Sequence, residues 1–153
     1  RFLLDNIINE RVSKMIPSSD KGEVFEFLTY QQKLKDYDLS IDELLSGSVD
    51  GRNDGGIDAI FIFLNGHLID NCAPFFPKSN AELEIYIFSC KHADSFKQEP
   101  VNSIIASLQE LLDFSLTKKD MCGDYNEDIY EKRNYYRYYY FIDNNNDAVC
   151  NIY

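Results

Sequence analysis

Residues 46–64 read SGSVDGRNDGGIDAIFIFL, a glycine-rich segment followed directly by β-branched and aromatic residues. Glycine permits tight turns and close approach of other groups, and an unbroken apolar run next to turn residues is typical of a buried strand. We therefore expect a strand over residues 57–64. The Asn65–Gly66 dipeptide is a strong hairpin signal, so residues 67–69 should return antiparallel to that strand.

The remaining elements follow from cap residues and hydrophobic periodicity. Asp20 and Ser40 each precede a glutamate by three positions, which predicts two helix starts, and the apolar stripe from Val101 to Leu116 has helical spacing. Helices are expected over residues 2–16, 20–34, 40–46 and 100–116, and further strands over residues 83–91 and 135–142. Residues 117–134 are polar and predict a loop. This order predicts an α/β domain with a mixed β-sheet.

The composition suits one domain with one hydrophobic core over residues 1–153, because 44% of the residues are hydrophobic and 14% are aromatic. Basic and acidic residues number 15 and 26, which gives a net charge of −11. The acidity is spread evenly, so no basic half is present to bind a nucleic-acid backbone. This charge limits how tightly the chain binds a polyanion by itself.

The sequence also bounds the cellular setting. No window has the roughly 18 consecutive apolar residues of a membrane span, and no secretory signal is present. No CxxC pair occurs, which disfavours a zinc site or a disulfide framework; the cysteines are Cys72, Cys90, Cys122 and Cys150. We expect reduced thiols in a cytoplasmic protein with no membrane partner. The chain starts at Arg1 and is expected to be the N-terminal part of a longer protein.

An acidic residue and a lysine are expected at neighbouring strand ends. Asp58 stands two residues after the Gly55–Gly56 turn, at the start of an apolar strand, where it either serves a site or caps the turn. Ser89 and Lys91 end the next long strand and share one face by alternation, while Cys90 points to the other face. Lys91 alone is also typical of an edge residue with its charge in water. Together, the carboxylate and the ammonium suit a divalent metal and a phosphate.

Two glutamates on the predicted second helix supply further carboxylates. Glu23 and Glu26 are three residues apart and therefore share a helix face. Glu23 is engaged by the expected cap, which leaves Glu26 as the freer group. A solvated helix face is the alternative explanation for this pair.

The order of these residues resembles the PD-(D/E)xK nuclease superfamily. Phe25–Glu26, the run Asp50–Ile60, and Phe88–Lys91 followed by Phe96 are similar to the N-terminal domain of abortive infection phage resistance (AIPR) proteins. They are also similar to the GID…QxK pattern of Mrr-type restriction endonucleases. The resemblance covers about residues 20–142. It implies a restriction-endonuclease-like fold, in which a mixed β-sheet is flanked by helices, with an αβββαβ core and an extra N-terminal helix.

The resemblance implies an endonuclease of phage defence, a hydrolase that cuts phosphodiester bonds in nucleic acid, expected to be DNA, with Mg²⁺ or Mn²⁺. Asp58, the backbone carbonyl of Cys90 and Glu26 would hold the metal. Lys91 would position or activate the attacking water, and Ser89 belongs to the catalytic set by its place in the motif. Hard oxygen ligands suit Mg²⁺, which polarises the phosphate and stabilises the leaving oxygen.

Ser89 departs from the family pattern, which has Glu, Asp or Gln at this position. A serine hydroxyl is a weak, neutral Mg²⁺ ligand, so metal affinity should fall unless Glu26, Asp54 or a water compensates. Asp54 is the reserve ligand, although its neighbours favour a role in the turn. One alternative is a catalytically inactive nuclease-like module that binds nucleic acid or a protein partner. Another is a plain interaction domain whose acidic surface contacts a basic protein.

The expected partners follow from the charge. Binding of nucleic acid should need divalent metal and basic surface from other domains of the parent chain, and a homo-oligomer is a further expectation. His92 would face away from Lys91 along the strand, which favours a surface role. The tyrosine run at residues 135–140 has two explanations, base stacking and a strand of mixed burial, and the strand is the simpler one.

Overall fold

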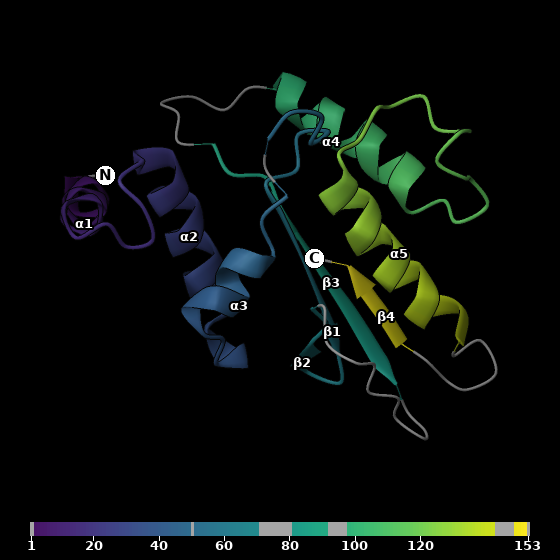
Figure 1. Ribbon diagram of the computed structural model, residues 1–153, viewed down its shortest axis with the longest axis horizontal. Helices are drawn as coiled ribbons and strands as arrows, with labels where there is room; N and C mark the ends of the chain where they lie inside the picture. Colours follow the sequence, from purple (N-terminus) through teal and green to yellow (C-terminus); the bar gives the residue numbers. More distant parts are fainter. Residues whose placement is uncertain (1, 50, 71–80, 92–97, 143–148, 153) are drawn as a thin grey trace. The chain divides into compact units, whose positions relative to one another are not determined.

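A computed structural model describes residues 2–49, 51–70, 81–91, 98–142 and 149–152 (Figure 1). The chain divides into two compact units, the first formed by residues 1–46 and 90–94 and the second by residues 47–89 and 95–153. The described secondary structure of the first unit is helical, whereas the second unit combines a β-sheet with two helices. The expected mixed α/β class is therefore confirmed.

The helices of the first unit are α1 (Phe2–Ser13), α2 (Lys21–Lys33), the short 3₁₀ helix η1 (Lys35–Tyr37) and α3 (Ile41–Ser46). Two of them, α2 and α3, begin at the predicted caps. The Asp20 carboxylate accepts a hydrogen bond from the Glu23 N–H at 3.0 Å. Ser40 and Glu43 form a complete capping box, in which each side chain accepts from the other residue's N–H, at 3.2 and 2.8 Å. Helix α1 ends before the predicted residue 16, because Met15 takes a left-handed φ of 54°.

The second unit is built on a four-stranded mixed sheet. Its strands are β1 (Ala59–Leu64), β2 (His67–Leu68), β3 (Glu82–Phe88) and β4 (Val149–Ile152), in the order β2-β1-β3-β4. Strand β1 is antiparallel to β2 and β3, and β4 is parallel to β3. Asn65 and Gly66 have φ values of 49° and 77°, so the β1–β2 hairpin predicted from this dipeptide is confirmed.

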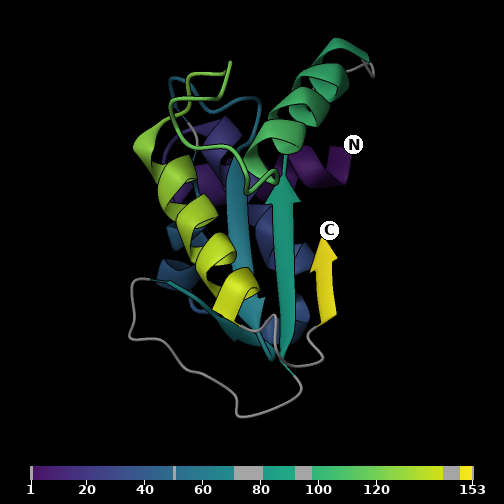
Figure 2. The same ribbon diagram turned by 90° about the vertical axis from the view of Figure 1, so that its right-hand side faces the viewer.

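Helices α4 (Gln98–Leu111) and α5 (Glu127–Ile142) complete the second unit, and α5 lies across one face of the sheet (Figure 2). Alternation along β1 divides its apolar residues between two faces. Ile60 and Ile62 belong to the core cluster that includes the buried side of α5, whereas Phe61 makes an edge-to-face contact with Phe88. None of the described helices combines the length and the apolar run that a membrane crossing requires.

The predicted strand over residues 135–142 is wrong, because this segment is the second half of α5. Ile129, Tyr136 and Tyr139 are buried while Arg137 and Tyr138 are exposed, which is the three-to-four residue period of a helix. The predicted loop over 117–134 is also partly wrong, since α5 starts within it. The sheet instead gains its last strand from β4.

Two predicted elements end earlier than expected. Strand β3 ends at Phe88 rather than at residue 91, because its partner β1 begins at Ala59 and the residues before it form a turn. Helix α4 ends at Leu111 rather than at residue 116. The Asp113 carboxylate accepts hydrogen bonds from the N–H and the hydroxyl of Ser115, and this turn replaces further helix.

Candidate active site

The turn before β1 is closed by Asp54. Its carboxylate accepts a hydrogen bond from the Gly56 N–H at 2.8 Å, and its backbone carbonyl accepts one from the Ile57 N–H at 3.0 Å. These contacts confirm the turn role that the neighbours of Asp54 favour. The turn therefore has a carboxylate of its own in Asp54.

Helix α4 fixes the same turn through Ser107. The hydroxyl of this buried serine donates to the Gly55 carbonyl at 2.8 Å. A β-carbon added at Gly55 would lie 2.7 Å from Ser107 Oγ and 2.8 Å from the Tyr125 ring, and the φ of Gly55 is +64°. Only glycine fits this position without displacing its neighbours. The turn and α4 are thus held in contact.

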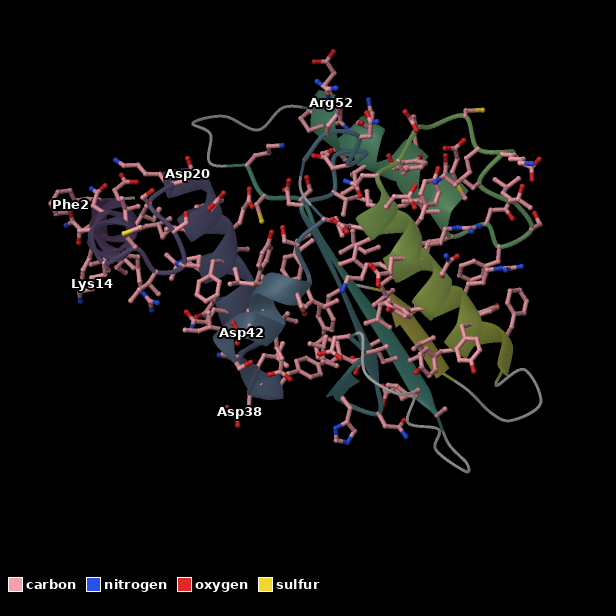
Figure 3. All side chains as sticks on the ribbon, viewed as in Figure 1. Phe2, Lys14, Asp20, Asp38, Asp42 and Arg52 are labelled. Atoms are coloured by element: carbon pink, nitrogen blue, oxygen red, sulfur yellow. The ribbon has the colours of Figure 1, made fainter. Side chains whose placement is uncertain are left out.

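Residues at the start of α5 hold the other end of the loop. The Asn126 side-chain amide donates to the Val49 carbonyl at 2.9 Å, and the Asn126 N–H donates to the Asn53 carbonyl at 2.9 Å. The same Asn126 side chain accepts from the Ile129 N–H at 3.0 Å and so caps α5. Arg52, between these contacts, projects outward from the loop (Figure 3). One asparagine therefore ties the loop to α5.

A carboxylate on α4 positions the segment that follows that helix. Glu110 accepts hydrogen bonds from the Tyr125 hydroxyl at 2.7 Å and from the N–H groups of Cys122 and Gly123 at 2.5 and 3.0 Å. These hydrogen bonds, that from Tyr125 first, lower the pKa of Glu110. Burial, assisted by the bond to Glu110, raises the pKa of Tyr125 to about 12. Tyr125 is thereby held against Gly55.

Asp58 is the last residue of this loop, directly before β1. Its side chain is buried, with 4% of the residue exposed, which is rare for a carboxylate. Its N–H donates to the Phe88 carbonyl at 2.8 Å, and its carbonyl accepts from the Val49 N–H at 3.0 Å. Ala59 pairs with Phe88 in the last pair of the β1–β3 register, so Asp58 and Ser89 are the residues that flank this last pair. The structure therefore brings these two predicted site residues to the same end of the sheet.

The other predicted site residues belong to the first unit. Cys90 and Lys91 directly follow Ser89 in the chain; Cys90 is half-buried and Lys91 is exposed. Glu26 lies in α2 and is half-buried. Their approach to Asp58, and the role of the Cys90 carbonyl, stay predictions. Asp50, His92 and Phe96, which entered the sequence argument, lie outside the described residues.

The oxygen ligands at this end of the sheet carry little negative charge with which to bind a metal ion. Within the described ranges, no three His, Cys, Asp or Glu side chains are grouped so as to hold an ion. Asp58 supplies one carboxylate and Ser89 one hydroxyl, both hard oxygen donors. Mg²⁺ is commonly bound through one or two carboxylates while it keeps several waters and binds substrate phosphates. The residues therefore fit Mg²⁺ in type and predict weak binding.

The supporting side chains were absent from the sequence prediction. The sequence pattern indicates a buried position for Ser107, since it stands three residues after Ile104 and four before Leu111, on the apolar side of its helix. No sequence pattern indicates the roles of Glu110 and Asn126, because their partners are distant in the chain. Arg133 is a further case: this buried residue donates to three backbone carbonyls at the end of α4 and beyond it.

Comparison of the chain with protein-family models, with curated proteins and with solved structures finds no match in any of the three. The resemblance to AIPR and Mrr-type nucleases therefore stays a prediction made from the motif residues. The functional argument depends on two observations that are independent of that resemblance. One is the burial of Asp58, and the other is its position at the same end of the sheet as Ser89.

Proposed function

We propose that this chain is a metal-dependent endonuclease domain that hydrolyses phosphodiester bonds in nucleic acid. The observation that supports it most strongly is the buried carboxylate of Asp58, at the end of the sheet where Ser89 follows β3. The loop before Asp58 is fixed by hydrogen bonds from α4 and from the start of α5. A carboxylate held in this way meets the demand of catalysis for a positioned metal ligand.

In this proposal each residue has one task. Asp58 holds the metal, with help from the Cys90 carbonyl and Glu26. Lys91 orients the attacking water and stabilises the negative charge that develops on the phosphate. A bound Mg²⁺ or Mn²⁺ supplies Lewis acidity to the phosphate and lowers the pKa of a bound water. Ser89 would offer its hydroxyl as a weak, neutral oxygen donor at the same site.

The arrangement of elements is compatible with the proposed restriction-endonuclease-like fold. From α3 to β4 the order is α-β-β-β-α-α-β, which differs from the expected order αβββαβ by one additional helix, α5, before the last strand. Asp58 precedes the first of these strands and Lys91 follows the third. We propose on this basis that the chain acts in phage defence in the cytoplasm, as AIPR-like proteins are expected to do.

The charge of the chain constrains how the substrate binds. A net charge of −11 repels a polyanion. DNA binding should therefore require divalent metal, which stands between the carboxylates and the phosphates. Basic surface from other parts of the parent chain would supply the remaining affinity. The proposal thus predicts cleavage at millimolar metal and weak binding without metal.

The second candidate is an inactive nuclease-like module that binds nucleic acid or a protein. Ser89 favours it, because a neutral hydroxyl stands where the family has an acidic residue or Gln. The scarcity of grouped carboxylates in the described part of the chain points the same way. Under this alternative, metal and nucleic acid bind without any cleavage. A plain interaction domain would bind neither.

The test is nicking of supercoiled plasmid with Mg²⁺ or Mn²⁺. Asp58→Asn and Lys91→Met should each slow cleavage about 100-fold or more, since each removes a group that acts on the transition state. Asp128→Asn and Lys119→Met, at exposed positions of the second unit, are the matched controls and should leave the rate unchanged. Urea unfolding of every variant separates lost chemistry from lost folding.

Three outcomes are decisive. Cleavage that disappears with a chelator and with both site variants supports the proposal. Equal cleavage by wild type and both site variants means that the site assignment is wrong. No metal-dependent cleavage by the wild type or by its longer parent protein, together with retained metal-dependent DNA binding, selects the inactive module.

A further inference from the structure

Arg52 is the basic residue of the loop that leads to Asp58. Between residues 46 and 64 the sequence has three aspartates and no other arginine or lysine. The side chain of Arg52 is exposed and projects away from the loop (Figure 3). Among the residues that the structure describes, its guanidinium has no hydrogen-bond or ion-pair partner. The N–H donors of this guanidinium are therefore available to a ligand in solution.

The backbone of Arg52 is connected to that of Asp58 by a short chain of contacts. The Asn126 side-chain nitrogen lies 2.9 Å from the Val49 carbonyl oxygen and 3.5 Å from that of Arg52, so one amide contacts both. The Val49 N–H in turn donates to the Asp58 carbonyl at 3.0 Å. The Asn126 N–H donates to the carbonyl of Asn53, the next residue, at 2.9 Å. The exposed guanidinium thus extends from a backbone that is fixed near the proposed metal ligand.

We propose that Arg52 binds a backbone phosphate of DNA close to the phosphate that is cut at Asp58. This inference rests on the proposed nuclease function and adds a substrate contact to it. A planar guanidinium donates two parallel hydrogen bonds to a phosphate, and such a contact reads no base. Phosphates of one DNA strand follow one another about every 3.4 Å along the helix axis. A cation fixed this near the metal ligand therefore meets a phosphate a few nucleotides from the cut.

The alternative role for Arg52 is to offset the negative charge of the loop itself. The carboxylates that shape this part of the molecule have other donors: Asp54 accepts from the Gly56 N–H, and Asp124 accepts from the Asn53 side-chain amide at 3.1 Å. Neither of these two described carboxylates forms an ion pair with Arg52. The loop therefore keeps its conformation without the guanidinium. In a chain of net charge −11, such a cation lowers the local repulsion of a phosphate.

Binding of a fluorescently labelled DNA duplex to the 153-residue chain tests the inference. Fluorescence anisotropy is measured with Ca²⁺, which also takes oxygen ligands, in place of Mg²⁺ and at several salt concentrations. Arg52→Met should weaken binding about tenfold and reduce the slope of log K against log salt by about 1, because one phosphate contact is lost. In plasmid cleavage with Mg²⁺ the variant should raise KM and leave kcat unchanged, since the contact is the same before and during the reaction.

Arg137→Met is the matched control, because it makes the same change at another exposed arginine of the second unit. Arg137 stands ten residues after the start of α5, which is about 15 Å along that helix. This variant should change neither the dissociation constant nor the salt slope. Arg52→Lys keeps the charge without the planar group and should bind DNA more tightly than Arg52→Met.

The outcomes separate this inference from the proposed function. If the wild type cuts plasmid and Arg52→Met binds DNA as tightly as the wild type, the inference is overturned and the nuclease proposal stands. A weakening as large in Arg137→Met also overturns it, because the effect is then one of net charge alone. DNA binding that depends on Arg52, without cleavage by the wild type, supports the contact and contradicts the nuclease. If Arg52→Met loses stability in urea unfolding with unchanged DNA binding, Arg52 serves the loop instead.

Discussion

The loop over residues 49–58 and the second half of α5 are held in different ways. The loop is fixed by hydrogen bonds from Asp54, Ser107 and Asn126, each to a particular backbone group. The second half of α5 is held through ring contacts, such as that between Phe114 and Tyr136 at 5.7 Å. Hydrogen bonds fix direction as well as distance, whereas ring contacts tolerate shifts. The contacts of the loop therefore fix its backbone more closely than the ring contacts fix the second half of α5.

The largest expected effect is at Gly55. Gly55→Ala should cost about 2–4 kcal/mol of unfolding free energy, because alanine is strained at positive φ and its β-carbon would overlap Ser107 and Tyr125. Gly66→Ala is the control: its φ is +77° but no atom lies within 4 Å of the added carbon. It should cost only the backbone strain, about 1 kcal/mol. If urea unfolding shows the same loss of unfolding free energy for Gly55→Ala and Gly66→Ala, the loop is not tightly packed at Gly55.

Arg133 tests whether the buried side of α5 also depends on hydrogen bonds. Its guanidinium donates to the carbonyls of Leu111, Asp113 and Leu116 at 2.8, 2.9 and 2.8 Å. Arg133→Met leaves these carbonyls without that donor and should cost about 2–3 kcal/mol of unfolding free energy. Arg133→Lys keeps the charge but not the planar guanidinium, so its unfolding free energy should lie between those of the wild type and of Arg133→Met. A Met variant as stable as the wild type would contradict this role.

Tyr125 makes the loop region sensitive to alkaline pH. Its pKa is raised to about 12, above the value near 10 of an unfolded chain. The stabilisation that this shift represents is complete below pH 10 and is lost as the pH rises through 12. Tyr125→Phe should cost about 1 kcal/mol at pH 7 and should flatten the loss of stability between pH 10 and 12. An unchanged slope in urea unfolding at these pH values would contradict the shift.

The smallest effect is expected at Tyr138, an exposed residue in the second half of α5. Tyr138 is 49% exposed, so Tyr138→Ala should change the unfolding free energy of the monomer by less than about 0.5 kcal/mol. The measurement is urea unfolding at a concentration where the chain is monomeric. If Tyr138→Ala lost as much unfolding free energy as Gly55→Ala, the glycine-rich loop and the second half of α5 would not differ in how tightly they are held.

Local turn and cap chemistry explains what the sequence predicted correctly. The hairpin at Asn65–Gly66, the capping box of Ser40 and Glu43, and the turn role of Asp54 each depend on residues a few positions apart. Such contacts form with little regard to the rest of the chain. The placement of Asp58 and Ser89 at the same end of the sheet follows from the antiparallel pairing of β1 and β3.

The tyrosine run shows why other predictions failed. Tyrosine is enriched in strands because its ring packs well on a half-buried sheet, and the same ring packs equally well on a helix. The positions of Tyr136 and Tyr139 on the buried side of α5 follow from its place over the sheet. The supports of the loop are also non-local: Ser107 is 52 residues from Gly55, and Asn126 is 77 from Val49. No short window of sequence contains such pairs.

The central claim is that Asp58 and Ser89 form one metal site. Its most direct test places at position 89 the glutamate that the family pattern allows there. The measurement is the Mg²⁺ concentration that gives half-maximal plasmid cleavage by Ser89→Glu and by the wild type. A second carboxylate at the same end of the sheet as Asp58 should lower that concentration about tenfold or more, and Asp58→Asn in the same chain should cancel the gain. An Mg²⁺ requirement that Ser89→Glu leaves unchanged would contradict the account.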